Sequence, residues 1–247
     1  MEIAAALIAG IAIGFVLGFI GAGGAMLTVP ILILGFGMNA HQATTASLAV
    51  VGAAALSGAI AKARNKEILY KDAFIIWAIG LLTNIGFASI VHRIPNLIIT
   101  IGFASVMTAA AFSMIVPSQE QDHRRMPLPS LIFLSLLIGS ITGLFGIGGG
   151  FIAIPILVRF FGTPQVIAAG TSLAIIALNS LTSLLSRHAL WSEVEWKVPL
   201  TMALTAVVVS IIATRYARIV KTEIARRAFG YFLMTMAIVS LIQAALN

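Results

Sequence analysis

Apolar segments follow one another along the whole of this 247-residue chain, and most are long enough to span the roughly 30 Å hydrocarbon core of a bilayer. Hydrophobic residues make up 60% of the chain and charged residues only 9%, whereas a soluble domain carries about 25% charged residues. The chain starts with Met-Glu and lacks the basic region and cleavage site of a secretory signal, so we expect the first helix to stay in the mature protein. The sequence therefore predicts an all-α polytopic membrane protein.

Several function classes lack the residues that they need. The absence of cysteine excludes disulfides and thiolate metal sites. The net charge of +7 comes from Lys and Arg in short loops, where the positive-inside rule explains them without nucleic acid. The chain has no Gly-x-Ser-x-Gly elbow, no His-Glu-x-x-His motif and no nucleotide-binding loop. We therefore expect no enzyme, no cofactor, no metal and no nucleic-acid partner.

The chain contains an internal repeat, because a shift of about 125 residues lays its start on its second half. The aligned stretches are residues 14–24 with 139–149, 30–32 with 155–157, 47–49 with 172–174 and, after one inserted residue, 70–71 with 196–197. We predict two homologous transmembrane repeats, residues 1–116 and 128–247, joined by a polar linker at residues 117–127.

Each predicted repeat has a helix, a glycine break, a short apolar segment and further long segments, giving about four to five membrane segments. The short segment has about 14 residues, or roughly 21 Å as a helix, which predicts a half-helix or the return arm of a hairpin. The segments run near 3–20, 24–37, 41–61, 72–91 and 95–116 in the first half, and near 128–145, 149–161, 165–187, 197–216 and 224–246 in the second.

The basic loops distinguish two topologies. If the short segments do not cross the membrane, basic residues divide about evenly between the two sides and give no orientation. If they do cross, one side keeps only Arg93, Arg187 and Lys197. That asymmetry favours five segments per repeat, an inverted second repeat and both termini outside the cytoplasm. The cytoplasmic side then collects Lys62, Arg64, Lys66, Lys71, Arg124, Arg125, Arg159, Arg215, Arg218, Lys221, Arg226 and Arg227.

Glycines interrupt the first apolar run of each repeat. Unpaired backbone groups cost several kcal/mol each in lipid, so such a break must be buried in protein or face a water-filled cavity. Inverted repeats bring two breaks together, and their free amides suit an anion near the midplane. The predicted substrate-binding glycines are Gly21, Gly23, Gly24, Gly146, Gly148 and Gly149. By contrast, we expect Gly14, Gly18, Gly139 and Gly143 to pack helices as small-xxx-small motifs.

Small polar side chains flank the breaks and are candidate ligands for the same substrate. An amide inside an apolar helix needs hydrogen-bond partners, which a substrate or a neighbouring helix must supply. Ser and Thr in membrane helices often bond only to the carbonyl four residues earlier, which is the alternative role for each hydroxyl. The candidates are Thr28, Ser47, Thr171, Ser172 and Asn179.

Charged residues indicate the sign of the substrate. All eight Asp and Glu residues fall in termini, loops or helix ends, which disfavours a cation site and is compatible with an anion held by neutral donors. Arg187, together with Lys62 and Arg159, is a candidate for attracting an anion, with interfacial snorkelling as the alternative. His41 borders an apolar segment and is a candidate coupling residue.

The first break carries Gly18-Phe-Ile-Gly21-Ala-Gly23-Gly24 with Pro30, and the second carries Gly143-Leu-Phe-Gly146-Ile-Gly148-Gly149-Gly150 with Pro155, followed by Gly170-Thr171-Ser172-Leu173. These paired motifs resemble the twin signature of the sulfite exporter (TauE/SafE) family. The resemblance covers nearly the whole chain and implies a plasma-membrane permease, mostly bacterial, that moves sulfite, sulfonates or related anions, usually outward. The first half departs from the pattern, because Thr45-Ala46-Ser47-Leu48 stands where Gly-Thr-Ser-Leu is more usual.

The leading hypothesis is a multi-pass secondary transporter of the bacterial or archaeal inner membrane that exports small sulfur-containing anions such as sulfite or organosulfonates. An anion channel, or a transporter of another small organic anion on the same scaffold, is the alternative. A third hypothesis is a membrane scaffold for a partner protein, and the lack of a soluble domain argues against it. The expected partners are the anionic substrate, the lipid bilayer and a second copy of the chain in a homodimer.

Overall fold

The computed structural model describes residues 1–115, 127–217 and 222–246, which form helices and short loops with no strand among them. The first half contains α1 (Glu2–Ile20), α2 (Gly24–Pro30), η1 (Ile31–Gly35), α3 (Ala40–Ala63), α4 (Tyr70–Ile90), η2 (Val91–Arg93) and α5 (Asn96–Ile115). The second half contains α6 (Leu128–Phe145), α7 (Gly150–Phe161), α8 (Gln165–Ser186), η3 (His188–Glu193), α9 (Lys197–Tyr216) and α10 (Thr222–Leu246). Each predicted segment agrees with a helical segment to within two residues at both ends.

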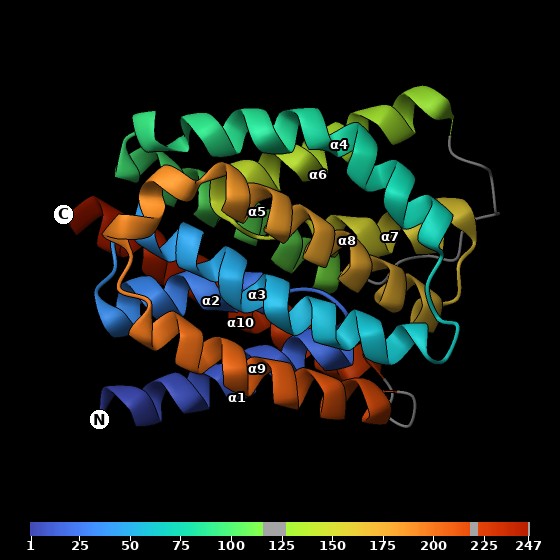
Figure 1. The fold of residues 1–247 in the computed structure, drawn as a ribbon, viewed down its shortest axis with the longest axis horizontal. Coiled ribbons are helices and arrows are strands. Elements are labelled where there is room, and N and C mark those ends of the chain that lie inside the picture. Colours follow the sequence, from blue (N-terminus) through green and yellow to red (C-terminus); the bar gives the residue numbers. More distant parts are fainter. Residues whose placement is uncertain (116–126, 218–221, 247) are drawn as a thin grey trace.

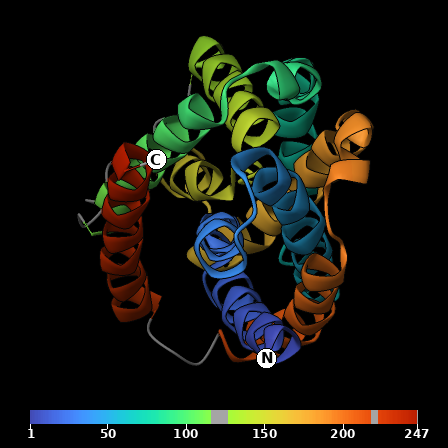
Figure 2. The same cartoon turned by 90° about the vertical axis from the view of Figure 1, so that its left-hand side faces the viewer.

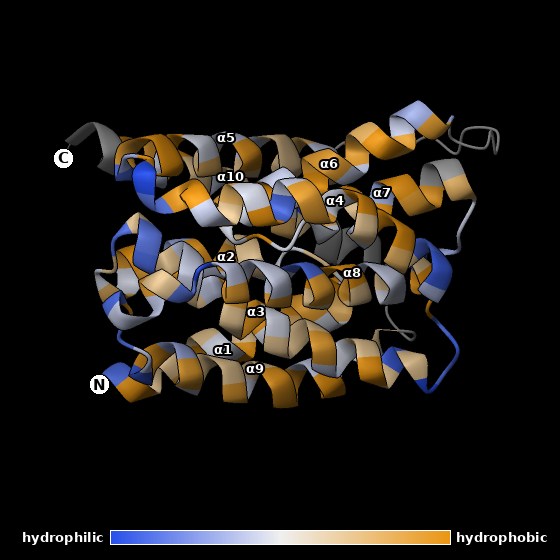
Figure 3. Ribbon diagram, turned by 45° about the horizontal axis from the view of Figure 1, so that its top comes forward, coloured by the Kyte–Doolittle hydropathy of each residue, from blue (hydrophilic) through white to orange (hydrophobic). Residues whose placement is uncertain are grey.

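The helices lie along the long axis of the molecule, and both chain ends lie at the same end of the bundle (Figure 1). Within the described residues, seven helices are long and apolar enough to cross a membrane: α1, α3, α4 with η2, α5, α6, α8 and α9. Hydrophobic residues fill the middle of the bundle and hydrophilic residues gather toward its two ends (Figure 3). Leu82 and Leu204 are 79% and 73% exposed, as lipid-facing side chains are. The prediction of an all-helical polytopic membrane protein is confirmed.

The two halves pack mainly against each other. The most extensive contacts join α1 to α9, α4 to α6, α5 to α10, α3 to α8 and α3 to α9, followed by α4 to α8. Exchanging each helix for its counterpart, α1 for α6, α3 for α8, α4 for α9 and α5 for α10, reproduces the same set of pairs. Figure 1 also shows that α1 runs away from the end that holds the termini, whereas α6 runs toward it.

Glycines allow the closest of these pairs to approach. A Cβ atom on Gly14 would lie 2.5 Å from the carbonyl oxygen of Ala206 in α9, and one on Gly18 would lie equally close to that of Ser210. In α6, Gly139 packs directly against α4, and a Cβ atom on Gly143 would lie 2.5 Å from the carbonyl oxygen of Asn84. These contacts confirm that the four glycines pack helices.

Of the two short segments, α2 lies inside the bundle, whereas α7 is exposed at Pro155 and Phe161. All seven residues of α2 are buried, and an end-on view places α2 within the surrounding helices, with α10 along one side (Figure 2). The helical stretch Gly24–Gly35 and its counterpart α7, which has 12 residues, are too short to cross a bilayer alone. The glycine breaks that precede them are buried at residues 21–24 and 146–149, so they lie within the protein and not at its surface.

Candidate functional site

The two glycine breaks are buried turns between helices. Gly21 ends α1 with φ 79°, and Gly23 follows with φ 88° just before α2. Gly146 ends α6 with φ 68°, and Gly148 and Gly149 continue with φ 74° and 70°. These five glycines are buried, as are Ala22, Gly24 and Ile147 beside them. Only glycine adopts this left-handed backbone readily, so the sequence specifies the turns at these positions.

Each break packs against a helix of the other half. A Cβ atom on Gly21 would lie 2.6 Å from the Cβ atom of Ala169 in α8, and one on Gly146 would collide with the carbonyl oxygen of Thr44 in α3. Thr44 and Ala169 occupy equivalent positions of the sequence repeat. The Ser47 hydroxyl, also in α3, donates a hydrogen bond of 3.2 Å to the Gly146 carbonyl. The backbone of each break is therefore fixed by a helix that lies more than 90 residues away in sequence.

Backbone amides at both breaks have no acceptor. The Gly21 N–H bonds to the Leu17 carbonyl and the Gly146 N–H to the Thr142 carbonyl, which completes α1 and α6. Beyond these bonds, the amides of Gly23, Gly24, Gly148 and Gly149 donate to no group in the part of the chain that the structure describes. Buried unpaired amides are rare in proteins, because each costs as much as a lost hydrogen bond. Water or a polar ligand must therefore satisfy these donors.

The predicted hydroxyl ligands point to backbone carbonyls. The Thr28 hydroxyl donates to the Gly24 carbonyl at 2.8 Å and the Ser172 hydroxyl donates to the Gly150 carbonyl at 3.1 Å, so both lie at the breaks. The Thr171 hydroxyl donates to the Ile167 carbonyl at 2.8 Å and accepts a bond of 3.0 Å from the Leu69 N–H. Because these hydrogens are already engaged, the free donors at the breaks are the amides and not the hydroxyls.

Arg187 is a buried clamp and not a snorkelling surface residue. Its side chain is 1% exposed, and Nη1 donates to the hydroxyls of Thr44 and Thr45 at 3.0 and 3.2 Å. Nη2 donates to the carbonyls of Gly143 and Leu144 at 2.5 and 2.8 Å. These carbonyls belong to the last turn of α6, where a cation also stabilises the negative end of the helix dipole. Arg187 thus ties α6, just before the second break, to the start of α3.

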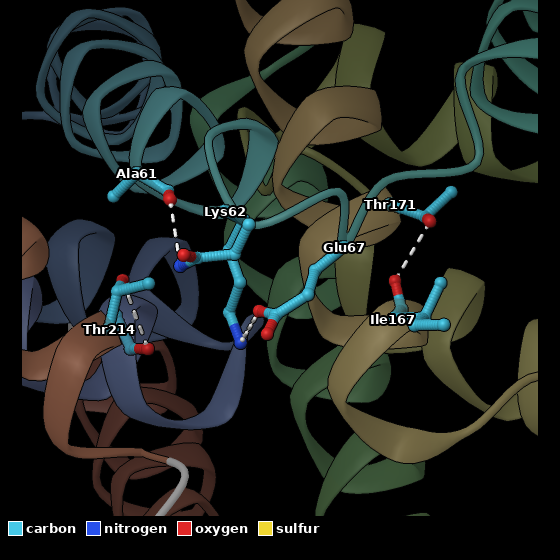
Figure 4. Close-up of polar contacts among 8 residues, drawn as sticks. Ala61, Lys62, Glu67, Ile167, Thr171 and Thr214 are labelled. Carbon is cyan, nitrogen blue, oxygen red and sulfur yellow. Dashed lines mark hydrogen bonds and ion pairs between the residues drawn. The ribbon is translucent and has the colours of Figure 1, made fainter.

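Lys62 occupies the position equivalent to Arg187 but has a different partner. Its Nζ lies 2.9 Å from Oε2 of Glu67, and the two side chains are only 3% and 12% exposed. Figure 4 shows Lys62 between Thr214 of α9 and Glu67 of the loop that follows α3. The same loop contacts α8, because a Cβ atom on Gly170 would collide with the Glu67 carbonyl. Sequence reasoning placed Glu67 in a loop and missed the pair, although the repeat aligns Glu67 with Glu193.

Asn179 belongs to a buried cluster of polar side chains between α4 and α8. Asn84 Nδ2 donates to the backbone carbonyl and the side-chain carbonyl of Asn179 at 3.1 and 2.9 Å, and the Ser183 hydroxyl donates to Asn84 Oδ1. These bonds fix the orientation of both amides. They leave Asn179 Nδ2 without an acceptor among the described residues, and the same holds for the neighbouring Ser180 hydroxyl. Asn179 thus presents a further free donor one turn along α8 from Ile176, which contacts Gly148.

The remaining candidates lie elsewhere. His41 lies in the first turn of α3, where its N–H donates to Asn96 Oδ1 at 3.2 Å and its carbonyl accepts from the Thr44 hydroxyl at 3.3 Å. The Arg159 side chain lies outside the described residues.

A cavity of about 460 Å³ opens at the end of the bundle that holds the termini, and its wall includes Pro30 and Thr44. This cavity therefore reaches the residue that supports both Arg187 and Gly146.

Comparison with known proteins assigns this arrangement to a family. The sequence profile described as "Sulfite exporter TauE/SafE" matches residues 6–240, which is nearly the whole chain. The chain belongs to this family. A protein of Xylella fastidiosa strain 9a5c, named "Probable membrane transporter protein", is 28% identical over 240 residues, covering 92% of this chain and 90% of the relative. A similarly named protein of Methanocaldococcus jannaschii is 36% identical over 117 residues, covering 45% of this chain and 43% of that protein.

Membership of the TauE/SafE family makes the chain a multi-pass transporter of the plasma membrane and not an enzyme. The match spans both glycine breaks and the helices that hold them. The family resemblance inferred from the break motifs is therefore confirmed.

Proposed function

We propose that this TauE/SafE transporter is a secondary transporter that exports small sulfur-containing anions, such as sulfite or organosulfonates. The proposal rests mainly on the two buried breaks, whose amides have no acceptor among the described residues. These amides belong to Gly23, Gly24, Gly148 and Gly149. Unpaired backbone N–H groups can stabilise the oxygens of a tetrahedral or pyramidal oxyanion without requiring a counter-charge. The name of the matching family supports sulfite or a related sulfur oxyanion as the occupant.

The proposal includes two inverted repeats that alternate access to the breaks. Three observations support it: the opposite directions of α1 and α6, the unchanged helix pairs when the halves are exchanged, and the support of each break by the other half. Transporters built in this way bind their substrate near the midplane, between discontinuous helices of the two repeats. With the short segments counted as crossings, the asymmetry of basic residues supports an orientation with both termini on the outer side of the membrane.

The charges around the breaks favour an anion. Arg187 lies beside the end of α6 and stays protonated, because a guanidinium is not deprotonated in proteins. The buried carboxylate of Glu67 is paired with Lys62, so it does not oppose an anion at the breaks. Asn179 Nδ2 adds a neutral donor on the wall formed by α8. Polar groups at membrane depth that lack protein partners are typical of transport pathways.

The direct test is uptake of labelled sulfite and taurine-like sulfonates into proteoliposomes that contain the purified chain. We expect saturable flux that is lost in Gly23→Val and Gly148→Val, because both positions have positive φ and a Cβ atom would meet Phe229 or Ile176. Gly86→Val is the matched control, since a Cβ atom there meets nothing within 4 Å. Flux that survives both break substitutions would exclude this site.

Two further outcomes separate the alternatives. Electrogenic flux that does not saturate would indicate an anion channel on the same scaffold. The second outcome is saturable flux of other small organic anions, while sulfite and sulfonates are neither transported nor compete. It would support the same binding site with a different class of substrate.

A further inference from the structure

A basic cavity lies between α3 and α9, at the end of the bundle opposite to the chain termini. Its volume is about 390 Å³, and Arg64 and Arg215 line it together with Ser57, Asn65 and Thr214. Neither arginine forms an ion pair with a carboxylate of the described residues. The rest of the wall, Ile60, Ala61 and Ile211, is apolar. The two guanidinium groups suit a phosphate oxyanion, whereas the hydroxyls of Ser57 and Thr214 already donate to backbone carbonyls.

The two arginines of the basic cavity have no counterpart in the other repeat, although the helices that form the cavity are duplicated. In the sequence repeat, Arg64 aligns with Ala189 and Arg215 aligns with Ser89. The equivalent place between α8 and α4 therefore has neither charge. The charged copy lies at the end where Lys62, Lys66 and Lys71 also lie. The assignment of that end to the cytoplasm rests on the proposed orientation of the chain. The cytoplasmic leaflet is the one that carries a negative surface potential.

An apolar groove begins where the basic cavity ends. The groove has a volume of about 490 Å³, lies between α3 and α8, and shares Ile60 with the basic cavity. Leu56 and Leu181 line it and are 54% and 56% exposed, and the small residues Ala49, Gly52 and Ala53 also line it. The groove therefore runs from the level of Arg64 toward the membrane interior, as the acyl chain of a lipid does.

We propose that the cavity and the groove together bind one anionic phospholipid of the cytoplasmic leaflet. The headgroup phosphate lies between Arg64 and Arg215, and one acyl chain lies in the groove between α3 and α8. The combination of a charged pocket and a continuous apolar groove distinguishes this occupant from a free phosphate, which would use the pocket alone. It also distinguishes it from a second copy of the chain, which would cover the groove and leave the two arginines unpaired.

The test measures binding of phosphatidylglycerol, phosphatidylcholine and inorganic phosphate to the full-length chain in detergent, by native mass spectrometry. We expect phosphatidylglycerol to bind in preference to phosphatidylcholine. Its affinity should fall about 30-fold in the double variant Arg64→Gln, Arg215→Gln, because each basic residue near a membrane surface contributes about 1 kcal/mol. The control double variant Lys66→Gln, Lys71→Gln removes the same charge at the same end and should change the affinity less than twofold.

A variant in the groove distinguishes a phospholipid from free inorganic phosphate as the ligand. Ala53→Phe fills the groove and should weaken phosphatidylglycerol binding while leaving that of inorganic phosphate unchanged. Equal binding of the two phospholipids, no loss in the arginine variant, or inorganic phosphate that binds as tightly as phosphatidylglycerol would overturn the proposal. A dimer that Ala53→Phe dissociates and that excludes lipid would overturn it in favour of a second copy of the chain.

Discussion

Replacing Arg187 by lysine tests whether the buried guanidinium holds the second break in place. Arg187 makes four hydrogen bonds that diverge in two directions, two to hydroxyls of α3 and two to carbonyls of α6. A lysine ammonium keeps the charge, but it is a compact group on a single stem and cannot reach both sets. We therefore expect Arg187→Lys to lose two of the four bonds.

The size of the effect follows from the burial of these bonds. A hydrogen bond to a charged group contributes about 1.5 kcal/mol at the lower end of its range, so the loss of two costs about 3 kcal/mol. For a chain of this length each kcal/mol corresponds to roughly 2–4 °C, which predicts a fall in the melting temperature of about 6–12 °C. The transport rate should fall as well, because Thr44 and the α6 carbonyls adjoin Gly146.

The assay is thermal unfolding of the purified chain in detergent, followed by tryptophan fluorescence. Arg93→Lys is the matched control, because Arg93 lies at the same end of the bundle but is exposed. A melting temperature of Arg187→Lys within about 2 °C of this control would refute the reasoning. In that case the four short contacts would contribute no more than a surface arginine does.

Three other sets of substitutions give independent checks. Gly146→Ala should prevent accumulation of folded protein, because φ is +68° and the new Cβ atom would collide with the Thr44 carbonyl. In the same expression and melting assays, the control Gly86→Ala in α4 should raise stability by about 0.5–1 kcal/mol. Glu67→Gln should cost about 3 kcal/mol, because the buried Lys62 loses its counter-charge, and Lys62→Met added to it should recover most of the loss. Single cysteines introduced into this cysteine-free chain at Glu2 and Arg64 should be labelled from opposite sides of the membrane by an impermeant maleimide. Labelling of both from one side would contradict the proposed orientation.

The helices could be predicted closely because the glycines and loops that end them are visible in the sequence. Gly21 and Gly146 end α1 and α6. Because the repeats align, a helix end that is visible in one repeat also indicates the equivalent helix end in the other. The partners of Arg187 could not be predicted. Gly143 and Thr44 lie on two other helices, and nothing in the spacing of the sequence indicates that these helices meet at Arg187. The same limit applies to Lys62, because the direction of a long side chain at a helix end depends on the loop that follows. The binding roles of the glycines and hydroxyls remain predictions for the flux assays.

Because the two halves pack against each other, the first half can reach its final structure only after the second half has been synthesised. The face of α1 that carries Gly14 and Gly18 packs on α9, which is synthesised only after most of the chain. Until then this face has lipid or a temporary neighbour against it, and the first break lacks its support from α8. A fragment that ends in the linker would therefore insert into the membrane without reaching its final structure. Only production of the complementary fragment in the same membrane would complete both breaks.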